Sequence, residues 1–141
     1  MPGDARTVHR ITPSQREEAF ARIATELAAR HDVAFAYVFG SSLAEPAFHD
    51  VDVAVWLQES PADPIDRALE LAAQLSRALK LPIDVRPLNG APVSFVFHAL
   101  RGRLLFARDE ERLAGTIEDT VRRYLDAAPL VRRATQEAFG S

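Results

Sequence analysis

The sequence predicts an α/β (α+β) fold, in which a small mixed β-sheet is flanked by helices. Three apolar segments, 33–39, 51–57 and 82–88, have the length and the β-branched and aromatic residues of strands. Segments with apolar residues at helical spacing lie between and around them. Strands joined by helices in this way pack as layers around one hydrophobic core.

The composition limits what the chain can do. Its 141 residues, 48% apolar and 26% charged, suit one soluble globular domain. A net charge of −3 argues against direct binding of nucleic acid, which needs a basic surface. The sequence has no cysteine, no apolar run long enough for a membrane span and no signal peptide, so we expect a cytoplasmic protein without disulfides.

The first helix is predicted from its start signal. Residues 1–11 are expected to form a flexible N-terminal arm, and residues 12–141 a single domain. Thr12-Pro13-Ser14-Gln15 combines an N-cap threonine, a first-turn proline and the glutamine of a capping box. Apolar residues then recur at helical spacing, so the helix should end near His31.

The second helix and the third strand follow from similar signals. Asp63-Pro64 begins a helix with one apolar stripe to about Lys80. After the third strand, 89–92 is a turn. The segment 93–101 alternates like a strand but also has the spacing of a short helix, so its pattern alone leaves both structures open.

The C-terminal part is predicted to be mostly helical. Residues 104–106 form a last short strand. A helix runs from Asp109 to about Ala127, and Pro129 starts another that reaches Phe139. Together these two helices would form a C-terminal helical hairpin.

The most informative motif lies between the first two strands. Gly40-Ser41-Ser42 follows the first strand, and Asp50-Val51-Asp52 opens the second. Because side chains alternate along a strand, Asp50 and Asp52 can face one side and the valines the other. Paired carboxylates repel unless a cation lies between them, and a glycine–serine turn offers N–H groups and a hydroxyl to an anion. The motif therefore predicts a metal next to a phosphate.

A third carboxylate, Asp84, lies in the middle of the third strand. Ile83 and Val85 occupy the apolar face, which places Asp84 on the other. Because burying this charge unpaired is costly, two interpretations stay open. Arg86, on the same face, could pair with Asp84, or Asp84 could complete a three-carboxylate site for Mg²⁺.

The order Gly-Ser, Asp-x-Asp and a later Asp resembles the DNA polymerase β-type nucleotidyltransferase superfamily. In size and C-terminal half the chain is most similar to the minimal nucleotidyltransferase (MNT) antitoxins that pair with HEPN toxins. The segments 83–89, 100–106 and 124–130 carry this second similarity. The resemblance spans most of the chain. It implies the nucleotidyltransferase fold and favours a helix for 93–101.

The loop after Gly40-Ser41 departs from the family pattern. Members usually follow Gly-Ser with one small or apolar residue and then Ala-Arg-Gly, whereas this chain has Ser42-Leu43-Ala44-Glu45-Pro46. The first aspartate also comes earlier, and His49 stands where a serine usually precedes it. The three carboxylates are kept, which favours metal binding. The altered loop differs from the segment that binds the triphosphate in the family, so the grip on the triphosphate should differ as well.

The resemblance implies an enzyme that uses ATP and two Mg²⁺ ions. It assigns metal binding and catalysis to Asp50, Asp52 and Asp84. It assigns nucleotide binding to Gly40, Ser41 and Ser42. The implied reaction transfers AMP to a tyrosine hydroxyl of a cognate HEPN ribonuclease toxin, and this adenylylation neutralises the toxin.

Two alternatives stay open. In the first, the fold is a catalytically degenerate nucleotidyltransferase that neutralises the toxin by binding alone. In the second, a nucleotide is transferred to a small molecule such as an aminoglycoside antibiotic. Enzymes of that kind usually carry an extra helical domain, for which 141 residues leave little room.

Overall fold

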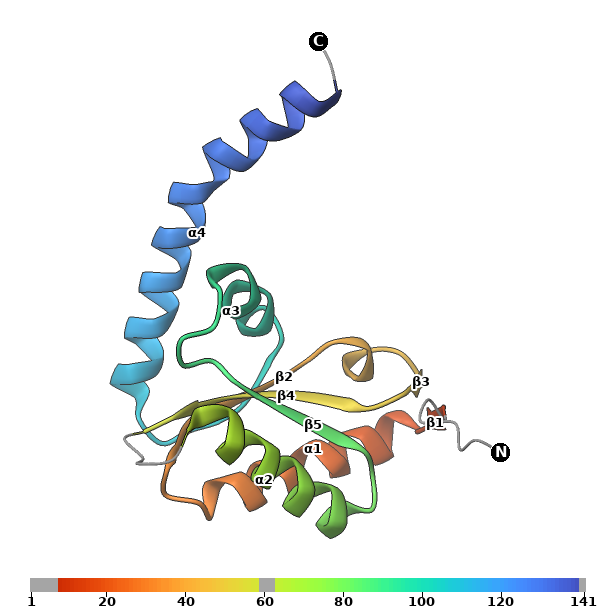
Figure 1. Ribbon diagram of the computed structural model, residues 1–141. Helices are drawn as coiled ribbons and strands as arrows, with labels where there is room; N and C mark the ends of the chain where they lie inside the picture. The colour runs from red at the N-terminus through yellow and green to blue at the C-terminus, as the bar shows by residue number, and fades with distance from the viewer. Residues whose placement is uncertain (1–7, 59–62, 140–141) are drawn as a thin grey trace.

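A four-stranded sheet with helices on both faces forms the body of the molecule (Figure 1). The structure, a computed structural model, describes residues 8–58 and 63–139, with 128–139 as backbone. In chain order the elements are β1 (His9–Arg10), α1 (Pro13–Ala28), β2 (Val33–Phe39), the 3₁₀ helix η1 (Ser41–Leu43), β3 (Ala47–Phe48), β4 (Val51–Leu57), α2 (Pro64–Leu79), β5 (Ile83–Pro87), α3 (Val93–Leu100), β6 (Arg103–Ala107) and α4 (Glu110–Phe139).

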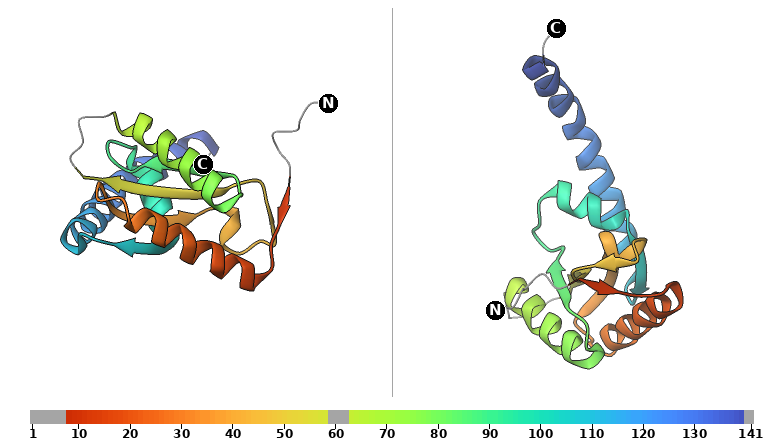
Figure 2. Two further views of the ribbon diagram at one scale, coloured as in Figure 1. Left: turned by 90° about the horizontal axis from the view of Figure 1, so that it is seen from below. Right: turned by 90° about the vertical axis from the view of Figure 1, so that its right-hand side faces the viewer.

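The main sheet has the strand order β5-β4-β2-β6. β2 is antiparallel to both neighbours, β4 and β6, whereas β4 and β5 are parallel and are connected by α2. α1 and α2 lie side by side across one face of the sheet (Figure 2), and α3 with the first part of α4 covers the other. The sheet is therefore mixed and flanked by helices, as the sequence predicts.

Two hydrophobic clusters, one on each face, hold these layers together. In β4, Val51, Val53 and Val55 point towards α1 and α2 and are buried there. In β2, the aromatic residues Phe35 and Tyr37 point the other way, into the cluster that includes α3. Alternation along β4 sends Asp52 to the α3 face, and β2 alternates in the same way from Phe35 to Phe39, although its register is irregular near Val33 and Phe35.

The two helices on the first face begin where the sequence predicts. Thr12 accepts from the N–H of Gln15 at 3.1 Å, and the Gln15 side chain accepts from the N–H of Thr12 at 2.9 Å. Asp63 caps α2 by accepting from the N–H of Ile65 at 2.8 Å. α1 ends at Ala28, a few residues before the predicted end. The segment 93–101 contains the helix α3, which confirms the helical interpretation.

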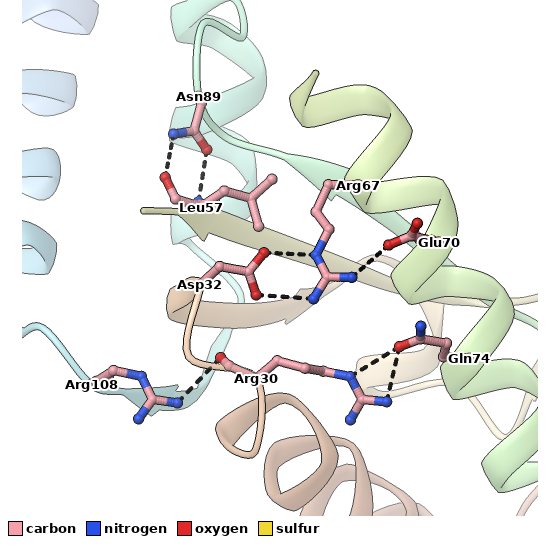
Figure 3. A network of polar contacts seen from close by, with 8 residues as sticks. All are labelled: Arg30, Asp32, Leu57, Arg67, Glu70, Gln74, Asn89 and Arg108. Carbon is pink, nitrogen blue, oxygen red and sulfur yellow. Dashed lines mark hydrogen bonds and ion pairs between the residues drawn. The ribbon is translucent and has the colours of Figure 1, made fainter. Parts of the chain in front are cut away.

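The end of the sheet at which β2 begins is held by polar contacts (Figure 3). Arg67 of α2 donates to both carboxylate oxygens of Asp32, at 2.7 and 3.0 Å. Asn89 exchanges two hydrogen bonds with the backbone of Leu57, at 2.9 and 2.8 Å. The Arg67 guanidinium holds the pKa of Asp32 below its ordinary value because it favours the ionised carboxylate.

The described end of the predicted N-terminal arm contains a short strand. His9 and Arg10 form β1, which pairs antiparallel with Phe48 and Ala47 of β3. The His9 and Phe48 rings also lie 6.2 Å apart. Residues 1–7 of the predicted arm lie outside the described residues. β1 could not be predicted from the sequence, because two residues are too few to show an alternating pattern.

The predicted C-terminal hairpin is wrong, because α4 is one helix from Glu110 to Phe139 that projects beyond the body of the domain (Figure 1). The helix runs through Pro129. A proline inside a helix removes one backbone hydrogen bond and bends the axis, at a cost of about 3 kcal/mol, but it does not have to end the helix. Tyr124 stacks on Phe97 of α3, with ring centroids 3.8 Å apart, so the helix is already docked before it reaches the proline.

None of the described helices has both the length and the apolar character needed to cross a membrane.

Candidate nucleotide and metal site

The register of β4 and β5 brings two of the predicted carboxylates together. Asp52 is the direct partner of Asp84 in this parallel pair. The valines beside them are buried against α1 and α2, so both carboxylates lie on the α3 face. Asp50 directly precedes β4. All three predicted metal ligands therefore lie at the beginning of two adjacent strands.

These carboxylates repel one another in the absence of a cation. The pKa of Asp52 is raised to about 7, first because the group is half-buried and then because of the charge and hydrogen bonding of Asp50. The charge of Asp84 raises the same pKa further, and Arg86 offsets only part of the effect. A carboxyl group whose pKa is raised by burial and by anionic neighbours is in a setting that a divalent cation would relieve.

Asp84 is held by an ion pair. The Nε of Arg86 lies 3.1 Å from its Oδ2, and the Arg86 guanidinium also lies 5.9 Å above the centre of the Phe95 ring. Of the two interpretations of Asp84, the structure thus displays the pairing with Arg86. Both side chains are well exposed, at 62% for Arg86 and 37% for Asp84, and exposed pairs of this kind are weak.

The three carboxylates do not surround one point. Within residues 8–58 and 63–127, no three acidic or histidine side chains are arranged as a ready metal site. Asp50 and Asp52 fit Mg²⁺ by their charge, hard oxygens and proximity, as the raised pKa of Asp52 shows. Asp84 lies opposite Asp52 in the strand register, and its carboxylate would have to leave Arg86 to contact a cation there.

Gly40 approaches these carboxylates more closely than any other residue type could. Its φ is +85°, in the left-handed region. The pairing of Phe39 with Asp52 brings the two strands together at this point, and a Cβ at position 40 would lie 2.6 Å from the Oδ2 of Asp52. The left-handed conformation favours glycine at this position, and a larger residue would also have to displace the Asp52 carboxylate.

The two serines after Gly40 have different surroundings. η1 is a tight turn in which the N–H of Leu43 donates to Gly40 and that of Glu45 donates to Ser41. Ser41 is exposed, whereas Ser42 is 1% exposed and its Oγ has no hydrogen-bond partner among the described residues. Only Ser41 therefore presents its side chain at the surface, and Ser42 belongs to the interior of the loop.

The loop is braced from outside, which the sequence did not indicate. The guanidinium of Arg16 in α1 donates to the carbonyl oxygen of Glu45 at 2.8 Å. The N–H of Ile11 donates to Pro46 at 3.0 Å, and the β1–β3 pair follows immediately. These residues lie far from the motif in sequence, and no periodic pattern links them to it. The shortened loop is thus fixed by the segment that precedes and begins α1.

Comparison with known proteins agrees with this geometry. The family model described as polymerase beta, nucleotidyltransferase matches residues 21–111, more than half of the chain. A search of curated protein sequences finds no significant match.

Solved structures share the fold at low identity. A chain of the complex between a tri-AMPylated HEPN toxin from Shewanella oneidensis and MNT antitoxin superposes with a TM-score of 0.64 and 17% identity, over 86% of this chain and 99% of that one. The toxin–antitoxin complex MntA-HepT gives 0.59 and 19%, over 85% and 99%. A toxin–antitoxin structure with AMP-PNP gives 0.61 and 18%, over 82% and 98%.

The family match covers the strands that carry Gly40 and all three aspartates, and the solved structures match nearly end to end. Gly40, Asp52 and Asp84, whose arrangement is described above, all lie within the residues that the family model matches. The chain belongs to the polymerase beta nucleotidyltransferase family.

Proposed function

We propose that this protein is an MNT-type antitoxin that uses Mg²⁺ and ATP to transfer AMP to a tyrosine hydroxyl of a cognate HEPN ribonuclease toxin in the cytoplasm. The observation that carries the proposal is the register that places Asp52 opposite Asp84, with Asp50 next to Asp52 and Gly40 in close approach to the Asp52 carboxylate. Family membership supports nucleotidyl transfer. The fold shared with structures that contain an AMPylated HEPN toxin or AMP-PNP supports the partner and the nucleotide.

Each residue has a role in this scheme. The backbone N–H groups of Gly40 and Ser41, with the Ser41 hydroxyl, would bind the β- and γ-phosphates. Asp50, Asp52 and Asp84 would hold two Mg²⁺ ions, whose charge offsets that of the phosphates and of the transition state.

The transfer is an in-line displacement at the α-phosphorus of ATP. The phenolic oxygen of the acceptor forms a bond to this phosphorus as the bond to the bridging oxygen breaks. Pyrophosphate leaves with the bonding electron pair. The phenolic proton passes to the carboxylate of Asp84, which lies on the acceptor side of the site, and from there to water.

The test is AMP transfer from α-labelled ATP to the HEPN protein encoded beside this one. Replacement of Asp50 or Asp52 by Asn should abolish labelling of the partner, because each change removes a metal-binding charge. Asp66→Asn, at an exposed position of α2, is the matched control and should label the partner normally. Undiminished transfer by both site variants, or the absence of any neighbouring HEPN gene, would contradict the proposal.

A second function, neutralisation by binding alone, is favoured by two observations. Asp84 is occupied by Arg86, and the loop lacks the arginine typical of the family. If this pairing persists with nucleotide present, the fold would cover the toxin without modifying it. Calorimetry with Mg²⁺ and millimolar ATP separates the two functions: no heat of binding, together with inhibition of the toxin ribonuclease, would favour binding alone.

A further inference from the structure

An open groove lies along the outer edge of β5, between α2 and α3. Its volume is about 590 Å³. One wall carries Ile65 and Leu69 of α2, which are 63% and 60% exposed, and the other carries Phe95 of α3. Asp84 and Arg86 also line the groove. An apolar groove that reaches a carboxylate of the site is therefore open to solvent (Figure 1 shows β5 between the two helices).

The groove lies in line with the rest of the site. Across the sheet, the loop that begins at Gly40 follows β2, Asp52 lies on β4 and Asp84 on β5, and the groove comes next. Neighbouring strands are about 4.8 Å apart. In-line displacement needs the leaving group, the reacting phosphorus and the acceptor in one row. If the loop binds the β- and γ-phosphates, the acceptor has to enter from the side of β5.

The edge of β5 does not suit an added strand. Backbone bonds from Pro82 and Leu88 to β4 show that even-numbered residues face the sheet, so the odd-numbered ones face outward. Ile83 is already satisfied there, because its N–H and C=O both bond to the Oγ of Ser76, at 3.0 and 3.3 Å. Pro87 has no N–H to offer. With Ile83 and Pro87 unable to pair fully, recognition in the groove relies chiefly on side chains.

We propose that this groove binds the acceptor segment of a protein substrate, with an aromatic side chain between the α2 wall and Phe95 and its hydroxyl at Asp84. This inference rests on the proposed function and specifies its acceptor. Ile65 and Leu69 offer exposed apolar area that an aromatic ring and its flanking residues would bury.

The charges of the groove argue against the other acceptor classes. A polycationic aminoglycoside needs several unpaired carboxylates, and a nucleic acid needs several cations. The groove lining contributes Asp84 and Arg86, which are paired with each other, and its other described residues carry no charge. An apolar segment with one phenolic hydroxyl is the acceptor that matches this lining.

The double substitution Ile65→Gln with Leu69→Gln tests the groove. Both side chains are exposed and glutamine favours helices, so α2 should fold normally. With the HEPN partner as acceptor, we expect kcat/KM to fall at least tenfold through a higher KM. The Kd of Mg²⁺–ATP, measured by calorimetry, should not change. Ala73→Gln, exposed on the same helix outside the groove, is the control and should behave as wild type.

A second readout keeps this test separate from that of the proposed function. The affinity of the wild type and the double variant for the unmodified HEPN partner is measured without ATP, where a tenfold loss is expected. If the double variant keeps the wild-type KM and affinity for the partner, the groove assignment is wrong. It is also wrong if the double variant loses affinity for ATP together with affinity for the partner, because the substitutions would then act on the whole site. Transfer to kanamycin in preference to the partner would overturn the acceptor class. If the wild type binds ATP and the partner but transfers no AMP, the proposed function is refuted. The affinities of the wild type and the double variant for the partner would then still test whether the groove binds it.

Discussion

Two aspartates at opposite ends of the β2–β4 pair have opposite electrostatic settings. Asp32, just before β2, receives two hydrogen bonds from Arg67, and its pKa is lowered. Asp52, at the start of β4, faces two other carboxylates, and its pKa is raised to about 7. The first end is arranged for stability. The second stores repulsion that a cation can relieve, which is usual for a binding site.

The comparison predicts that changes at the Asp52 end affect activity and changes at the Asp32 end affect stability. The largest expected effect is that of Gly40→Ala. Because the new Cβ would lie 2.6 Å from the Asp52 carboxylate at a φ of +85°, AMP transfer should fall at least 100-fold and the melting temperature should also fall. Labelled-ATP transfer and thermal unfolding measure the two effects.

Gly90→Ala is the control for backbone strain. Gly90 also has a positive φ, but a Cβ added there would meet nothing within 4 Å, so only the conformational cost of about 1 kcal/mol applies. Equal destabilisation by both substitutions would show that close approach to Asp52 contributes nothing.

At the other end, Asp32→Asn should destabilise the fold by about 1–2 kcal/mol at pH 7 without changing transfer, because Arg67 loses a bidentate, partly buried partner. A carboxyl whose pKa is lowered by folding contributes stability above its unfolded pKa and loses it as the pH falls through the folded value. The difference between wild type and variant in urea unfolding should therefore shrink steadily as the pH falls below the ordinary pKa of an aspartate, about 3.9. A difference that persists there would place the effect outside this ion pair.

Asp52→Asn should do the reverse and stabilise the metal-free protein. Folding raises this pKa, so the wild type loses stability as the pH rises from about 4 to 7, whereas asparagine mimics the protonated form. A shift of this size corresponds to about 4 kcal/mol, which solvent screening of a half-exposed group reduces to about 1 kcal/mol. Thermal unfolding in a chelator between pH 5 and 9 measures it. If the Asp52→Asn variant is less stable than wild type at pH 8, the ionised Asp52 carboxylate does not destabilise the metal-free protein.

The smallest effect is expected for the brace of the loop. Arg16→Ala removes the bond to Glu45, so the KM for ATP should rise about fivefold and amide exchange at 41–48 should accelerate. Arg22→Ala is a matched control, since Arg22 lies on the same helix and donates to a backbone carbonyl, that of Ala78, away from the loop. If both variants change the KM for ATP and the amide exchange of 41–48 equally, a general loss of α1 stability causes the change, and the bond from Arg16 to Glu45 does not.

The sequence was a good guide wherever one strand or helix decides the outcome. Alternation alone placed Asp52 opposite the valines of β4, and the cap at Thr12 set the start of α1. The position of Asp84 on its own strand was equally readable. These features depend on neighbours in the chain, so the residue types specify them.

What the sequence did not show depends on contacts between distant segments. Arg67 pairs with Asp32 across 35 residues, and Arg16 reaches Glu45 across 29. β1 exists only because β3 lies beside it. α4 passes through Pro129 although a proline removes one hydrogen bond of the helix, so the local preference for a break did not decide the outcome.

The helix α4 has two parts that differ in what they contact. Up to Tyr124 it packs on α3 and β2, with Thr120 buried. Its last turns project away from the body of the domain (Figure 1), and neither part carries Gly40 or the three aspartates. Exchanging only the projecting end should therefore leave the site in place, whereas exchanging the docked part would disturb the face of the sheet on which Asp52 and Asp84 lie.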